Sequence, residues 1–173
     1  MKVPELEQLR FLDLRLADLE DKDLKTLLDS PYLTNLIGLN LQGNRLKARG
    51  AGLLASCEKL SQLKSLNIAG NRIQAKGLVT LGKSSCLDEV TRLDAWNCHI
   101  SGKGLSDFAA TKGLPKLEFL DVAQNQFKDS ISGFRKQSRP LKYLNISRSG
   151  IDREHANVIA TTPGLANLRE LRI

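Results

Sequence analysis

Several things are scarce in this 173-residue sequence, and each scarcity argues against a class of protein. Its three cysteines, an odd number at wide spacing, argue against a disulfide framework and for a reducing compartment. No apolar run approaches the roughly 18 residues that a membrane-spanning helix requires. The opening stretch, MKVPELEQLRFLDL, lacks the apolar core of a secretory signal peptide. We therefore expect a cytoplasmic protein without a membrane span.

Groups that perform catalysis are equally scarce. There are only two histidines, His99 and His155, and no CxxC, HExxH or phosphate-loop pattern. His99 follows Cys98 directly, and neighbours in an extended segment point to opposite sides, so the two cannot form a nucleophile–base pair. Cys57, Cys86 and Cys98 lack the spacing of zinc ligands, and each is expected to be a small buried thiol. We expect no enzymatic activity, no cofactor and no metal site.

A repeat dominates what the sequence does contain. An apolar pattern of up to eleven residues occurs seven times, with first positions at Leu9, Leu36, Leu63, Val90, Leu117, Leu141 and Leu168. The spacing is 27 residues throughout, except for 24 residues between the fifth and sixth copies. A fixed period in this range is typical of solenoids and other repeat architectures.

These copies, such as LIGLNLQGNRL at 36–46 and LKSLNIAGNRI at 63–73, resemble the LxxLxLxxNxL motif of the leucine-rich repeat over nearly the whole chain. A repeat that is this long and contains a helix is similar to the ribonuclease-inhibitor-like subfamily. The phrases DSPYLTNLIGLNL and TTPGLANLRELRI resemble repeats of bacterial proteins in that subfamily. The resemblance implies a strand, a turn and a helix in each repeat.

The second half of each repeat independently predicts the helix. Apolar residues three positions apart recur in the second to fourth repeats, as in Leu78 and Leu81, which fits one face of a short helix. A glycine is expected just before each helix, at Gly50, Gly77 and Gly104.

The predicted fold is α/β: a right-handed, curved leucine-rich-repeat solenoid of about six and a half repeats, forming a single domain over residues 1–173. Neighbouring strands lie about 4.8 Å apart, whereas packed helices need about 8–10 Å. Stacking both therefore forces an arc with parallel strands on the concave face and helices on the convex face. The alternate strand residues are polar, so we expect the concave face to be open for binding.

Two departures from the pattern have structural consequences. The fifth repeat is three residues short, has Ser138 where a leucine is expected, and continues into Pro140, which predicts only a short helix or turn and a locally thinned core. The asparagines at 44, 71 and 125 are expected to cap buried backbone groups, but the equivalent residues are Ala17, Cys98 and Ser149 in other repeats. Cys98 is therefore expected to be a buried structural thiol.

The two ends of the sequence lack the strong caps that the ends of a solenoid need. Met1–Gln8 is expected to form a weak cap, and the chain stops inside a strand, LRELRI, with no cap. We therefore expect a fragment of a longer protein, or a chain whose open end is covered by another chain. Self-association through Leu168–Ile173 is one form of such cover.

The expected function is non-catalytic binding of another protein on the concave strand face. The candidate binding residues are Trp96, Phe119, Tyr143 and Arg92, flanked by Asp94 and Asp121. Aromatic residues and arginine are enriched in interfaces, and an exposed aromatic patch usually marks a binding site. Three alternatives stay open. The aromatic side chains could cover one another or face a further part of a longer chain, and the Asp/Asn column could be an ordinary solvated strand position.

Two further functions stay open as alternatives. The resemblance allows the chain to be the recognition part of a larger effector or of a ubiquitin-ligase-type protein. The net charge of +7 lies in residues 61–173, with the densest basic stretch at 128–153, so binding of nucleic acid through repeats five and six is the second alternative. We expect a solvated basic surface there instead, because most of these residues fall on the helical side of the ring.

Overall fold

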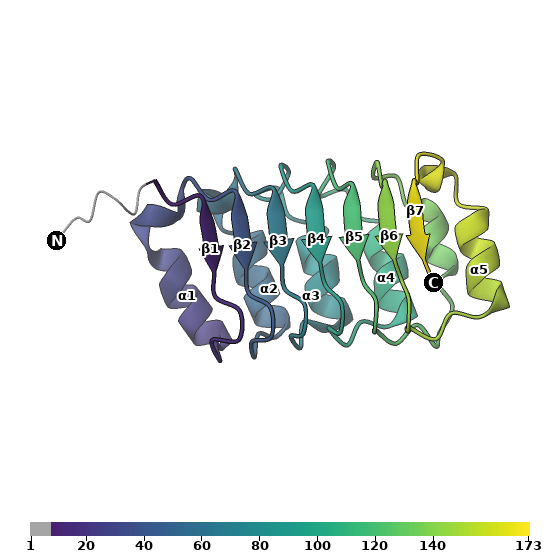
Figure 1. Cartoon of the computed structure of the whole chain (residues 1–173), viewed down its shortest axis with the longest axis horizontal. Helices are drawn as coiled ribbons and strands as arrows, with labels where there is room; N and C mark the ends of the chain where they lie inside the picture. Colours follow the sequence, from purple (N-terminus) through teal and green to yellow (C-terminus); the bar gives the residue numbers. More distant parts are fainter. Residues whose placement is uncertain (1–7) are drawn as a thin grey trace.

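The computed structural model describes residues 8–173, in which strands and helices alternate along the chain (Figure 1). The seven strands have three residues each: β1 Phe11–Asp13, β2 Gly38–Asn40, β3 Ser65–Asn67, β4 Arg92–Asp94, β5 Phe119–Asp121, β6 Tyr143–Asn145 and β7 Glu170–Arg172. The α-helices are α1 Asp21–Asp29, α2 Ala48–Ala55, α3 Gln74–Leu81, α4 Gly102–Ala109 and α5 Arg153–Ala160. Short 3₁₀ helices complete four repeats: η2 Pro31–Leu33, η3 Glu58–Leu60, η4 Ser132–Lys136 and η5 Pro163–Leu165.

All seven strands form one parallel sheet in the order of the sequence. Equivalent positions of successive repeats are paired, which confirms the expected α/β solenoid. The first strand position forms a column of Phe11, Gly38, Ser65, Arg92, Phe119, Tyr143 and Glu170. The third strand position forms a column of Asp13, Asn40, Asn67, Asp94, Asp121, Asn145 and Arg172.

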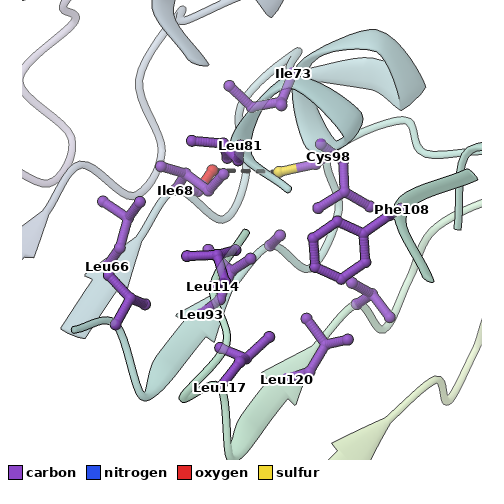
Figure 2. Packing of buried hydrophobic residues seen from close by; sticks show 14 of the residues in the cluster. Leu66, Ile68, Ile73, Leu81, Leu93, Cys98, Phe108, Leu114, Leu117 and Leu120 are labelled. Carbon is purple, nitrogen blue, oxygen red and sulfur yellow. Dashed lines mark hydrogen bonds between the residues drawn. The ribbon is translucent and has the colours of Figure 1, made fainter. Parts of the chain in front are cut away.

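The helices cover only one face of the sheet. In Figure 1 the strands lie in front and the helices lie behind them. The middle leucine of each inner strand, such as Leu66 or Leu93, is fully buried against the helices together with Phe108 and Leu117 (Figure 2). The opposite face, which we call the strand face, carries the side chains of the two strand columns described above. No helix among residues 8–173 has the length and apolar composition to cross a membrane.

The glycines expected just before the helices lie inside their first turns instead. A Cβ on Gly77 would lie 2.5 Å from Cγ2 of Ile73, and one on Gly104 would lie 2.4 Å from Cβ of Ala75. Both distances are far below van der Waals contact, so these positions have no room for a side chain. The glycines therefore let the start of one helix approach the chain next to it.

The short fifth repeat contains the five-residue helix η4 in place of an α-helix, as its missing residues predict. Ile131 and Phe134 are buried, but the position of the absent leucine is filled differently. Ser138 is exposed, and its neighbours Gln137 and Arg139 are buried. The solvated basic surface that we expect over residues 128–153 does not include Arg139, because this side chain is only 3% exposed.

The guanidinium of Arg139 is buried because it binds backbone carbonyls at the end of α4. It donates hydrogen bonds to the carbonyl oxygens of Phe108, Thr111 and Gly113, and its carbon lies 4.2 Å from the centre of the Phe108 ring. Burial lowers the pKa of Arg139 to about 10, so the side chain is still charged at neutral pH. This arginine joins the fifth repeat to the fourth.

Candidate functional site

Three of the predicted binding residues lie in contact on the strand face. Phe119 and Tyr143 stack on adjacent strands, with ring centres 4.0 Å apart and planes only 5° apart. The guanidinium carbon of Arg92 lies 3.6 Å from the centre of the Phe119 ring, and that of Arg172 lies 5.4 Å from the centre of the Tyr143 ring. These four side chains form a continuous stack across four strands, and we call it the strand-face stack.

Carboxylates hold the two arginines of the stack in place. Arg92 donates to both carboxylate oxygens of Asp94, at 2.7 and 2.9 Å, and Arg172 donates to Glu170 at 2.8 Å. Each pair joins residues two apart on one strand. A bidentate arginine–carboxylate pair fixes the plane of the guanidinium, so Arg92 lies ready-oriented over Phe119. Burial raises the pKa of Tyr143 above its usual value, so the phenol is neutral at physiological pH.

The Asp/Asn column has mainly a structural role in the strands. In five repeats the side-chain oxygen of this column accepts a hydrogen bond from the backbone N–H two residues later. These residues are Asp13, Asn40, Asn67, Asp121 and Asn145. Asp121 also accepts a hydrogen bond from the Asn145 amide at 3.0 Å. Asp94 differs because its carboxylate is buried and bound to Arg92. Asp94 therefore positions the stack, and Asp121 is largely satisfied within the sheet.

Trp96 lies near the stack but in a third column. Gly70 N–H donates to the Trp96 carbonyl, and Asn97 N–H donates to the Ala123 carbonyl, so the ladder continues past the strand ends. Its neighbours in the adjacent repeats are consequently Ala69 and Ala123, which are both buried. Trp96 itself is half-buried.

A hollow of about 360 Å³ lies beside the stack on the strand face. Small residues, Gly38 and Ser65, line it between the side chains of Phe11 and Arg92. Phe11 leans across Gly38, where a Cβ would lie 2.7 Å from Cδ1 of the Phe11 ring, and Phe11 is nevertheless 70% exposed. An exposed aromatic ring next to a hollow is a feature of many binding surfaces.

Sequence reasoning missed two members of this surface. Phe11 and Arg172 belong to the first and last strands, and the motif gives no sign that either reaches a neighbouring repeat. The strand register could have predicted the contact of Arg172 with Tyr143. Arg172 is on the strand next to Tyr143, two residues along from its partner Glu170, and a long side chain can span that diagonal. The signal for Phe11 is the glycine opposite it in the register.

The cysteines and His99 lie away from this surface. Cys98 is fully buried, and its Sγ donates to the Ile68 carbonyl at 3.2 Å (Figure 2). Burial raises the pKa of Cys98 to about 12, so the thiol stays protonated, while His99 is exposed. The expectation of buried thiols is wrong for Cys57 and Cys86, which are partly exposed. Among residues 8–173 no cluster of three or more His, Cys, Asp or Glu residues could hold a metal ion.

His155 joins α5 to the preceding repeat. Its Nδ1 lies 2.5 Å from the carboxylate of Asp152, and its Nε2 lies 3.2 Å from the backbone carbonyl of Asp129. Burial alone would lower the pKa of His155, but the hydrogen bonds to Asp152 and Asp129 raise it above its ordinary value. The backbone and side chain of His155 lower the pKa of Asp152.

Stability should accordingly depend on pH through this pair. A raised histidine pKa stabilises the fold below about pH 6.5, and this contribution is lost as pH rises through the folded value. A lowered aspartate pKa stabilises the fold above about pH 4 and is lost as pH falls through the folded value. We expect His155→Gln to lower the free energy of unfolding more at pH 5.5 than at pH 8.5 in urea titrations. The exposed His99→Gln is the matched control, and an equal loss at both pH values would contradict this role.

The last strand leaves apolar side chains uncovered in this chain. Leu171 is 39% exposed and Ile173 is 60% exposed, and within residues 8–173 β7 pairs only with β6. A hollow of about 450 Å³ lies beside them and is lined largely by apolar residues of α5, η5 and β7. Self-association through Leu168–Ile173 stays a prediction. The cap expected at Met1–Gln8 lies outside the described residues apart from Gln8.

One turn of this solenoid matches a known family. Residues 59–82 match the family model described as Leucine Rich repeat. No curated protein matches the chain at a significant level. The matched segment contains β3 and α3, and the same unit of strand and return segment recurs along residues 8–173 with equivalent positions paired. Residues 59–82 are therefore similar to a leucine-rich repeat, and the alternation of parallel strands and helices along residues 8–173 is consistent with a leucine-rich-repeat solenoid.

Proposed function

We propose that the chain is a non-catalytic protein-binding module whose binding surface is the strand face. The strand-face stack of Arg92, Phe119, Tyr143 and Arg172 carries this proposal. Its side chains are held by stacking and ion pairs before any partner arrives, so binding costs little further side-chain entropy. A leucine-rich repeat protein is generally an interaction module, and this stack gives the face its anchor residues.

The partner's chemistry follows from what the stack presents. The faces of Phe119 and Tyr143 cover each other, and the two guanidiniums cover their outer faces, so ring edges are what is left for a partner. Nucleic-acid bases need open ring faces to stack on, which favours a protein partner. The charges of Arg92 and Arg172 are also neutralised by Asp94 and Glu170. A polypeptide that places an apolar side chain in the hollow beside Phe11 fits this surface.

Selection of displayed peptides on the immobilised chain tests the proposal. We expect binders whose affinity falls at least about fivefold, or about 1 kcal/mol, with Trp96→Ala or Tyr143→Ala, because truncated anchors lose buried contact area. The affinities are measured by isothermal titration calorimetry with purified protein. Circular dichroism of each variant confirms that the fold is retained.

Arg153→Ala is the matched control, since Arg153 is an exposed residue on α5, behind the sheet. It should change the affinity less than twofold. Peptides that bind equally well to both strand-face variants would show that this face is not the binding surface.

The proposal also covers the subfamily of the repeats and the location of the protein in the cell. The 27-residue units with a strand and a helix support the ribonuclease-inhibitor-like subfamily. The three free cysteines support a reducing location such as the cytoplasm.

A further inference from the structure

A second surface lies on the loops that leave the strands, at the lower edge of the sheet in Figure 1. It is a hollow of about 760 Å³ at the edge of the first four repeats. Its charged lining residues are the basic Lys22, Arg45, Lys47, Arg49 and Arg72 and the acidic Glu20 and Asp21, with His99 at one side. We call this surface the basic groove. Five cations against two carboxylates give it a positive charge that the linear sequence conceals, because residues 1–60 are neutral overall.

Three of the five basic side chains of the groove form no ion pair within residues 8–173. Arg45 pairs with Asp18, and Lys22 pairs with Glu20. Lys47, Arg49 and Arg72 make no ion pair with any carboxylate of residues 8–173, and all three are exposed. Most charged residues near the strand-face stack are paired, so the basic groove differs in kind from that surface.

The backbone holds two of these cations next to each other. Lys47 and Arg72 form a parallel β-bridge between neighbouring repeats, which places their backbones about 5 Å apart. Like charges at directly opposed positions destabilise a sheet unless an anion lies between them. The Arg72 N–H donates to the Leu46 carbonyl, so this arrangement is fixed by the fold and not by side-chain flexibility.

We propose that the basic groove binds an acidic peptide segment of a partner protein, independently of the strand face. Glutamate or aspartate carboxylates of such a segment would pair with Lys47, Arg49 and Arg72. Glu20 and Asp21, whose carboxylate accepts the Lys47 N–H at 2.9 Å, would repel a continuous polyanion, and no Phe, Tyr or Trp side chain lines the groove for bases to stack on. A short acidic peptide avoids both difficulties, because only some of its residues carry charge.

A defined probe tests this proposal without knowledge of the natural partner. A fluorescein-labelled peptide of six glutamates is titrated with the whole chain, and binding is followed by fluorescence anisotropy at about 50 mM salt. We expect saturable binding that weakens at about 200 mM salt. The double variant Arg49→Gln/Arg72→Gln should weaken it at least about tenfold, because two charge contacts are lost.

The matched control removes two positive charges from the densest basic stretch of the sequence. Lys128 and Arg148 are exposed and unpaired with carboxylates of residues 8–173, so Lys128→Gln/Arg148→Gln changes net charge equally. It should alter the affinity less than twofold. Equal losses in both double variants would mean that net charge alone drives binding, and no binding to the wild-type chain would also overturn the proposal. A single-stranded RNA decamer that binds more tightly, and is lost with Arg49→Gln/Arg72→Gln, would assign the groove to nucleic acid instead.

Discussion

Replacing Arg139 by alanine should lower the free energy of unfolding by about 3 kcal/mol. The substitution removes the Arg139 donors to the carbonyls of Thr111 and Gly113 and one of the donors to the carbonyl of Phe108, which keeps its hydrogen bonds from Thr111. It also removes the guanidinium from the face of Phe108 and leaves a void next to the core. Recovery of the desolvation cost of the charge offsets only part of this loss. Urea unfolding followed by circular dichroism measures the change.

Two other variants separate the role of Arg139 from a general effect of charge. Arg139→Lys keeps the charge but has no planar fork to bind several carbonyls, so it should be intermediate in stability. Lys136→Ala removes an exposed cation from the same short repeat and should change stability by less than about 0.5 kcal/mol. If Arg139→Ala and Lys136→Ala were equally stable, Arg139 would not be joining the repeats.

Replacing Asn71 by alanine should cost about 2–4 kcal/mol. Its buried amide nitrogen donates to the carbonyls of Leu41 and Ile68 at 2.9 Å, and its oxygen accepts the N–H of Leu46 at 2.9 Å. These backbone groups belong to two repeats, and water cannot reach them once the amide is gone. Thermal and urea unfolding of the variant measure the loss.

The chain itself supplies the controls for Asn71. The fourth repeat has Cys98 at the equivalent position, where Sγ donates to the Ile68 carbonyl, so Asn71→Cys should cost less than Asn71→Ala. Asn67→Ala removes the same type of side chain from the strand face, where Asn67 is partly exposed, and should cost less than about 1 kcal/mol. A loss with Asn67→Ala as large as that with Asn71→Ala would show that burial of the ladder is not the cause.

The repeat predicted the strands and their alignment because each depends on local periodicity. A leucine such as Leu66 or Leu93 can be buried only if its strand neighbours face away, and a constant period then aligns equivalent residues of adjacent repeats. Short-range pattern therefore determined the columns. The contact between Phe119 and Tyr143 followed from those columns, although the nearly parallel stacking of their rings did not.

The features that sequence reasoning missed depend on long side chains that leave their own position. Arg139 was expected at the surface because arginines usually are, and nothing local shows that carbonyls of the previous repeat lack donors. Arg172 likewise contacts Tyr143 through a long side chain that leaves its own column. The basic groove combines residues of several repeats, so no window along the sequence displays its charge.

The shortened fifth repeat gives the molecule an uneven resistance to local unfolding. In a linear array each unit is stabilised mainly by its two neighbours, so an opening that starts at one end stops at the strongest joint. Arg139 ties the fifth repeat to the fourth through its hydrogen bonds to the carbonyls of Phe108, Thr111 and Gly113. An opening that starts at the C-terminal end is consequently expected to stop at this joint, with the first five repeats still folded. Phe119 and Tyr143 lie on the fifth and sixth repeats, so a ligand bound to both would hold the sixth repeat against the fifth and slow this opening.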